Sequence, residues 1–179
     1  MRIAFSGAHR VGKTTLLERV ADALPEYLVV PEPYYLLEEE GYHGSENPSI
    51  EDFEAQLERS IRSLEEAPRK ALFDRCPADL LAYLLTHRRA AEFLLHDWLE
   101  RIHSAMRSLD LIVFVPIEDP ERIALAPHED ARHRLAVHEK LEGLLVHDDL
   151  GFGTDVLAVP GDVPERLAQV MARVPSQGE

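Results

Sequence analysis

The sequence predicts an α/β fold in which a five-stranded parallel sheet lies between two layers of helices. Short apolar segments alternate along the chain with longer segments of helical periodicity, an order typical of parallel sheets. A glycine-rich loop joins the first apolar segment to the first helical one. The 179 residues suit one core, and no long linker or internal repeat divides them. We therefore expect a single domain over residues 1–179.

The expected strands are short, apolar and bounded by glycine, proline or charged residues. They cover residues 2–6, 27–30, 70–74, 109–115 and 155–159. The segment LDLIVFV at 109–115 is the clearest strand, because it is continuous, short and rich in branched side chains.

The expected helices repeat apolar side chains at intervals of three and four residues. Ser49 and Asp52 form a pair typical of a capping box at the start of the second helix. Residues 34–48, which contain two glycines and a proline, are expected to be irregular. The helices cover residues 14–24, 49–66, 78–85, 90–106, 130–145 and 164–174.

The charge balance limits the partners of the protein. Lysines and arginines number 19 against 33 aspartates and glutamates, which gives a net charge of −14. This charge argues against binding to nucleic acid or to an anionic membrane surface. No apolar run approaches the roughly 18 residues that span a bilayer, and the single cysteine, Cys76, cannot form an internal disulfide. We expect a cytoplasmic protein and leave its oligomeric state open.

One motif carries chemistry by its spacing. GAHRVGKT at 7–14 matches G-x-x-x-x-G-K-[ST], and it lies between an expected strand and an expected helix, as the motif requires. The predicted phosphate loop consists of Gly7, Ala8, His9, Arg10, Val11, Gly12, Lys13, Thr14 and Thr15.

Each residue type in this loop has a physical role. The glycines let backbone N–H groups point inward, where they and the positive end of the helix hold a β-phosphate. Lys13 is expected to reach the β- and γ-phosphates, and the hydroxyl of Thr14 is expected to bind Mg²⁺. The motif predicts a site for ATP or GTP with Mg²⁺.

A second motif, FDRCPADLLAYL, follows the third expected strand. Asp74 and Arg75 end that strand, at the edge of the sheet where parallel α/β proteins bind ligands. The carboxylate of Asp74 can hold magnesium-bound water, and the guanidinium of Arg75 can bind a substrate oxygen or phosphate. The alternative is a surface Asp-Arg pair. Guanine-reading Asn-Lys-x-Asp is absent, and the acids Glu118 and Asp119 lie too far past their strand for a motor-type ATPase.

The patches GAHRVGKTTL, VVPEP and FDRCPADLLAYL together resemble the P-loop nucleoside and nucleotide kinases. They are most similar to the nicotinamide-riboside kinase domain branch with its AAA-type ATP-binding relatives, and they are also similar to the deoxynucleoside kinases. The resemblance implies a P-loop NTPase fold with a helical lid. It covers most of the chain by element order, although the motifs fill only these patches.

The resemblance also implies roles on the acceptor side. Glu32 matches the carboxylate that takes the proton from a substrate hydroxyl, and Arg75 matches the arginine beside the acceptor. Gln56 matches a glutamine that reads the base, and Tyr34 or Tyr35 could stack on it. Open alternatives are a polar residue between two prolines for Glu32, an exposed helical side chain for Gln56, and core packing for the tyrosines.

Enzymes of this type close a basic lid over the triphosphate, and here the lid is expected at about residues 117–134. Its arginines are Arg122, Arg132 and Arg134. Arg132 and Arg134 lie two apart on a helix and so face different sides, and Arg132 is our candidate for contact with phosphate. A surface helix with salt bridges is the alternative.

We therefore expect ATP- and Mg²⁺-dependent phosphoryl transfer to a small nucleoside-like or nucleotide-like acceptor. The predicted catalytic residues are Lys13, Glu32, Arg75 and Arg132; the predicted metal ligands are Thr14 and Asp74; the predicted acceptor contacts are Glu32, Tyr35, Gln56 and Arg75. An NTPase that hydrolyses ATP or GTP, and a non-catalytic nucleotide sensor, are the alternatives.

Overall fold

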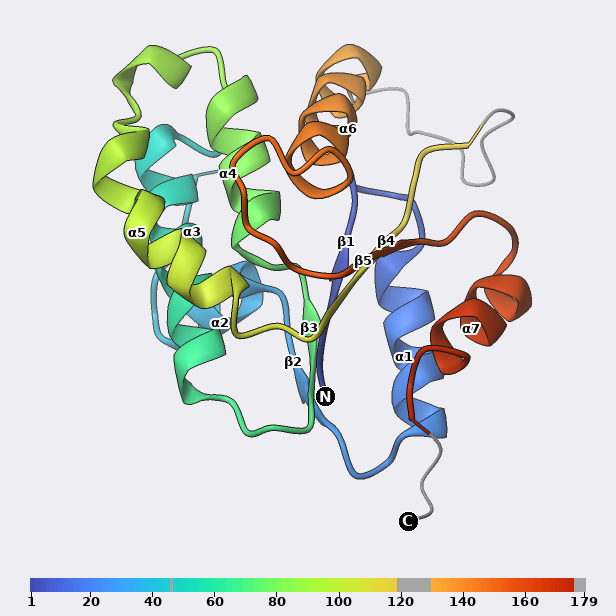
Figure 1. Ribbon diagram of the computed structural model, residues 1–179. Helices are drawn as coiled ribbons and strands as arrows, with labels where there is room; N and C mark the ends of the chain where they lie inside the picture. Colours follow the sequence, from blue (N-terminus) through green and yellow to red (C-terminus); the bar gives the residue numbers. More distant parts are fainter. Residues whose placement is uncertain (46, 119–129, 176–179) are drawn as a thin grey trace.

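A computed structural model describes residues 1–45, 47–118 and 130–175, and its centre is a five-stranded sheet (Figure 1). All pairings are parallel, and the strand order is β2-β3-β1-β4-β5. The predicted fold class is confirmed. The strands are β1 (Arg2–Ser6), β2 (Leu28–Val30), β3 (Ala71–Asp74), β4 (Leu111–Phe114) and β5 (Val156–Ala158).

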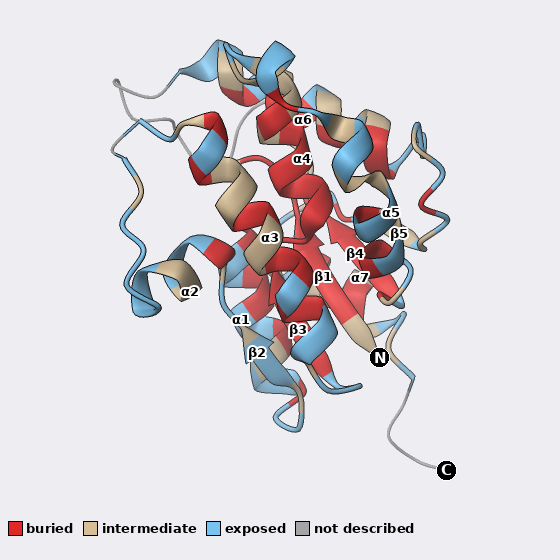
Figure 2. Ribbon diagram, turned by 90° about the vertical axis from the view of Figure 1, so that its left-hand side faces the viewer, coloured by how far each residue is buried: buried red, intermediate tan, exposed pale blue. Residues whose placement is uncertain are grey.

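Helices cover both faces of the sheet. On one face of the sheet, the inner residues of α1 and α7 form one apolar core with the strands. On the opposite face, the other helices form a second core (Figures 1 and 2). The first layer is α1 (Lys13–Ala23) and α7 (Val163–Met171). The second is α3 (Ile50–Glu66), α4 (Pro77–Thr86), α5 (Leu95–Met106) and α6 (Ala131–Leu145), with the 3₁₀ helix η1 (Ala90–Glu92) and, beside α3, α2 (Pro33–Glu39).

The position of β1 at the centre of the sheet explains why residues 3–5 are all apolar. Ile3 and Phe5 pack into the core formed with α1 and α7, whereas Ala4 packs into the core on the opposite face. All three side chains are fully buried. A strand buried on both faces has no solvent side, so alternation of polar and apolar residues is lost.

The register of the sheet brings the two motifs together. Phe5 of β1 lies opposite Asp74 of β3, and the backbone N–H of Arg75 donates to the carbonyl of Phe5 at 3.0 Å. The chain leaves β1 at Gly7 and leaves β3 at Arg75, on the same edge of the sheet. The phosphate-loop segment and the Asp-Arg pair are therefore neighbours because the strands are parallel.

Capping residues fix where the site helices begin. Ser49 and Asp52 form the predicted capping box of α3. Cys76 and Asp79 form a second capping box at the start of α4, and this one was not predicted. The second box matters for the site because it buries the carboxylate of Asp79 near the phosphate loop.

Two predicted elements differ from the structure. Residues 34–39, expected to be irregular, belong to α2, which begins with Pro33 and is followed by Gly41 at φ 87°. Proline at the first helical position and glycine just past the end mark a helix even without an apolar stripe. The helix expected over residues 90–106 is interrupted between η1 and α5, where Phe93 is buried and packs near Trp98.

The expected lid falls largely on residues 119–129, which lie outside the described residues, and Arg122 lies there too. Within the described ranges, no helix is long and apolar enough to cross a membrane.

Candidate functional site

Residues 7–12 connect β1 to α1, and three of them have a positive φ, which most residue types rarely adopt. Gly7 has φ 146°, and a Cβ at this position would lie 2.5 Å from the carbonyl oxygen of Val115. Gly12 caps α1 at φ 88°, and Arg10 has φ 55° although it is not a glycine. The two motif glycines are thus required by a close backbone contact and by a left-handed helix cap.

Lys13 opens α1 and is buried in the loop. Its ammonium donates to the carbonyl of Ala8 at 2.8 Å. Burial, followed by the charge of Arg75, lowers the pKa of Lys13 to about 8, although the carboxylates of Asp79, Asp74 and Glu32 partly oppose this shift. An anion placed in the loop would restore the favourable surroundings of a charged amine.

Thr14, in the first turn of α1, lies next to Asp74 at the end of β3. The hydroxyl of Thr14 donates to Oδ2 of Asp74 at 2.7 Å. The other oxygen, Oδ1, is buried and has no hydrogen-bond partner among the described residues. Burial, the largest influence, raises the pKa of Asp74. A buried carboxylate oxygen in need of a partner, next to a hydroxyl, fits the oxygen ligands that Mg²⁺ prefers.

Arg75 lies directly after β3 and is buried, with φ 77° in the left-handed region. Its Nε donates to Oε1 of Glu32, which precedes α2, and its guanidinium lies 5.3 Å from the ring centre of Tyr83. Burial alone would lower the pKa of Arg75, but Tyr83, Glu32 and Asp79 outweigh it and raise the pKa well above its ordinary value. A charged arginine held in a strained backbone conformation is typical of functional sites.

Asp79 connects the two motifs, and sequence reasoning missed it. Its fully buried carboxylate accepts from the backbone N–H of Gly7 at 3.1 Å and of Cys76 at 3.0 Å. Its Oδ1 also lies 3.6 Å from Nη1 of Arg75. The signal in the sequence was its place three residues after the α4 cap.

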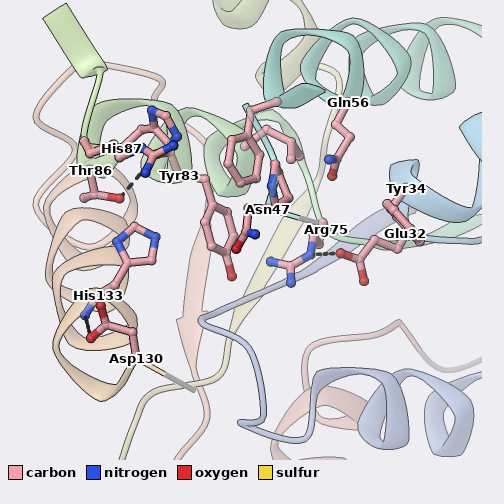
Figure 3. Close-up of a pocket in the computed structure, with 14 residues that line it drawn as sticks. Glu32, Tyr34, Asn47, Gln56, Arg75, Tyr83, Thr86, His87, Asp130 and His133 are labelled. Atoms are coloured by element: carbon pink, nitrogen blue, oxygen red, sulfur yellow. Dashed lines mark hydrogen bonds and ion pairs between the residues drawn. The ribbon is translucent and has the colours of Figure 1, made fainter. Parts of the chain in front are cut away.

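A pocket of about 650 Å³ opens beside Arg75 and Glu32 (Figure 3). Its apolar wall includes the stacked rings of Phe53 and Tyr83, with centres 5.3 Å apart. The full lining is Glu32, Tyr34, Asn47, Pro48, Phe53, Gln56, Arg75, Leu80, Tyr83, Thr86, His87, Arg88, Asp130 and His133.

The pocket includes three of the four predicted acceptor contacts. Glu32, Gln56 and Arg75 line it, and Gln56 is buried rather than exposed. Tyr35 does not line it: the ring is 56% exposed and packs edge-on against Tyr34, which does line the pocket.

The N-terminus of α6 forms another side of the site. Asp130 caps the helix by accepting from the backbone N–H groups of Arg132 and His133, each at 3.0 Å. Arg132 is exposed, whereas Arg134 is buried and its Nε donates to the carbonyl of His9 at 2.9 Å. Of the two predicted lid arginines described here, Arg134 is the one that contacts the phosphate loop.

Comparisons with known proteins bear on the fold. A family described as an AAA domain matches residues 2–166. No curated protein matches the sequence. Deoxyadenosine kinase from M. mycoides with bound dATP has a TM-score of 0.66 at 14% identity, over 97% of this chain and 98% of that one. Thymidylate kinase from Ehrlichia chaffeensis has a TM-score of 0.64 at 14% identity, over 96% and 97%.

NadR protein in complex with NR has a TM-score of 0.67 at 16% identity. The alignment covers 96% of this chain and 50% of that one, so the chain spans about half the length of NadR. At these identities the likeness establishes the fold, which is that of the P-loop nucleoside and nucleotide kinases.

Proposed function

The chain belongs to the AAA domain family. We propose that it is a phosphotransferase. It would transfer the γ-phosphoryl group of ATP or GTP, bound with Mg²⁺, to a small nucleoside-like or nucleotide-like acceptor. We assign this activity to residues 1–179 as one domain, with a lid at about residues 117–134. The kinases that share the fold support the reaction class, and the site residues support the chemistry.

One observation carries the proposal: a pocket of nucleoside size is lined by Arg75, whose neighbour Asp79 accepts a hydrogen bond from Gly7 of the phosphate loop. Glu32 and Arg75 line the pocket and also act electrostatically on Lys13 of the loop. A hydrolase needs only water opposite the γ-phosphate, and a sensor needs no second cavity. A volume of about 650 Å³ lies within the range of small-molecule sites.

On the donor side, the loop N–H groups and Lys13 are proposed to hold the phosphates. Thr14 and Asp74 would hold Mg²⁺, which when bound neutralises charge on the phosphate oxygens. Arg132, exposed near the start of α6, is proposed to neutralise charge on the transferred group. Excluding water from this side would favour transfer over hydrolysis.

On the acceptor side, Glu32 is proposed to accept the proton of an attacking hydroxyl. The ion pair with Arg75 fixes the direction of this carboxylate, and Arg75 can also bind an acceptor phosphate. Gln56 can donate to and accept from a base, while Phe53 and Tyr83 provide an aromatic wall for it. Tyr34, which lines the pocket and packs edge-on against Tyr35, is proposed to touch the acceptor.

The test is a product-detected screen. Purified protein is incubated with ATP or GTP and Mg²⁺ against nucleosides, nucleoside monophosphates and nicotinamide riboside, and products are identified by mass spectrometry. We expect one class of acceptor to gain a phosphoryl group. Gln56→Ala is the acceptor-side variant, and it should raise the acceptor KM about tenfold while the nucleotide KM stays unchanged.

Two outcomes would contradict the proposal. Release of inorganic phosphate at a rate that no acceptor changes would favour a hydrolase. Tight nucleotide binding without turnover across the whole panel would favour a sensor.

A further inference from the structure

Three successive carbonyls of the phosphate loop are held by two buried arginines from distant parts of the chain. Arg134 of α6 donates through Nε to the carbonyl of His9 at 2.9 Å and through Nη2 to that of Arg10 at 3.5 Å. Arg166 of α7 donates through Nη1 to the carbonyl of Val11 at 2.8 Å. The two residues are only 3% and 4% exposed.

These arginines reach the loop from the two helical layers. The inner residues of α6 belong to the core on one face of the sheet, and those of α7 belong to the core on the other (Figure 1). Each helix therefore carries one guanidinium to the edge where the loop lies. The loop is held from both layers at once.

Arg166 is itself anchored. Its Nη2 lies 3.1 Å from Oε2 of Glu118, and Oε1 of the same carboxylate accepts from the backbone N–H of Gly161 at 2.7 Å. Burying a guanidinium costs free energy unless charged and hydrogen-bonding partners offset it. A buried arginine that pairs with an anchored carboxylate and also donates to a loop carbonyl points to a role in holding that loop.

Peptide geometry explains what such a hold would achieve. In each peptide unit the C=O points opposite to the N–H, so a loop that turns its N–H groups toward a phosphate turns its carbonyls away from it. The carbonyls of His9, Arg10 and Val11 bracket Arg10, whose φ of 55° is unfavourable for a residue with a side chain. Donors fixed to the carbonyls keep these peptide planes in place.

We propose that Arg134 and Arg166 are positioning residues that hold the phosphate loop in its anion-binding conformation through its outward carbonyls. The proposal rests on the nucleotide-binding half of the proposed function and is independent of the acceptor. The two arginines act on the phosphates through the loop backbone rather than by touching them.

The test uses Arg134→Lys and Arg166→Lys, which keep the charge but lose the planar fork. Binding of ATP and of GTP, each with Mg²⁺, is measured by calorimetry, and amide hydrogen exchange is measured over residues 7–12 without nucleotide. We expect affinity to fall about tenfold or more in each variant and loop exchange to become at least several-fold faster. Arg173→Lys is the matched control, because Arg173 follows α7 and pairs with Asp155 instead of the loop.

Wild-type affinity and wild-type loop exchange in the two folded lysine variants would overturn the proposal. If a lysine variant does not fold, Glu118→Gln replaces it. This change removes the charge that anchors Arg166 from a position near the surface. We then expect faster amide exchange at Val11 and Gly12, and unchanged exchange would contradict the proposal. If the wild type binds neither nucleotide, the proposed function fails, while the exchange comparison still decides the role of the arginines.

Discussion

The donor and acceptor sides of the candidate site are built in opposite ways. The donor side is a run of nine consecutive residues, 7–15, whose glycines are explained by the backbone itself. The acceptor pocket takes its lining from segments spread between residues 32 and 133. The phosphate loop is a local backbone structure formed by consecutive residues, whereas the pocket exists only once the helices have packed.

The two sides also differ in what holds them. Loop residues are fixed by main-chain contacts, to the carboxylate of Asp79 on one side and to buried arginines on the other. The pocket is fixed by side chains, chiefly the Arg75–Glu32 pair and the stacked rings of Phe53 and Tyr83. Variants should therefore separate the two sides by which substrate they affect.

Lys13→Ala should have the largest effect, because it removes the only side-chain ammonium in the loop. Loss of a preorganised charge costs about 10² to 10³ in kcat, and loss of a charged hydrogen bond weakens binding by about a further tenfold, so kcat/KM for the nucleotide should fall about 10³- to 10⁴-fold. Steady-state kinetics and calorimetry check both parts. Wild-type activity in this variant would remove the donor assignment.

Glu32→Gln should affect transfer alone. Without a general base the transfer rate to a hydroxyl should fall by about 10² to 10⁴, while nucleotide affinity stays at the wild-type value. Calorimetry with nucleotide and single-turnover transfer assays measure the two quantities separately. An equal loss of nucleotide binding would move Glu32 to the donor side.

Asp79→Asn should disturb both sides together, because Asp79 contacts Gly7 and Arg75. The side-chain amide of asparagine has only one acceptor oxygen for the two backbone N–H groups that Asp79 binds, and it removes a negative charge beside Arg75. The free energy of unfolding should therefore fall by about 1 to 3 kcal/mol. Urea denaturation measures this change, and kinetics should show weaker use of both substrates. A variant with wild-type stability and only one affected substrate would contradict the bridging role of Asp79.

The pH dependence should be smaller and confined to the donor side. Burial, followed by the charge of Arg75, lowers the pKa of Lys13 to about 8 in the free protein. An amine loses its charge above its pKa, so kcat/KM for the nucleotide should fall up to tenfold per pH unit above about pH 8. Lys13→Arg stays charged in this range, and its nucleotide affinity should be flat there. A wild-type profile that is flat to pH 10 would contradict the assignment.

Sequence reasoning succeeded where adjacency along the chain or along parallel strands decides contact. The loop is contiguous, and Thr14 meets Asp74 because the carboxyl ends of β1 and β3 lie side by side. The stripe of α6 also contains information that was not used: Arg134 lies three and four residues before the buried Val137 and His138, which places it on the inner face. Arg132, two residues earlier, is exposed.

Contacts between distant elements could not be read in this way. No spacing brings Glu32 to Arg75, or Arg166 to Val11, across 43 and 155 residues. The choice between Tyr34 and Tyr35 depends on how the short, exposed α2 is rotated, and it has no apolar stripe to decide this. These features depend on tertiary packing, which cannot be read directly from a single sequence.

The most direct test of a two-sided site follows the γ-phosphate itself. With γ-labelled nucleotide, Mg²⁺ and the best acceptor, the label should appear on the acceptor at a rate well above its release as inorganic phosphate. Glu32→Gln should lose this labelled product while still binding nucleotide. Label found only as inorganic phosphate, at a rate that no acceptor changes, would contradict the account.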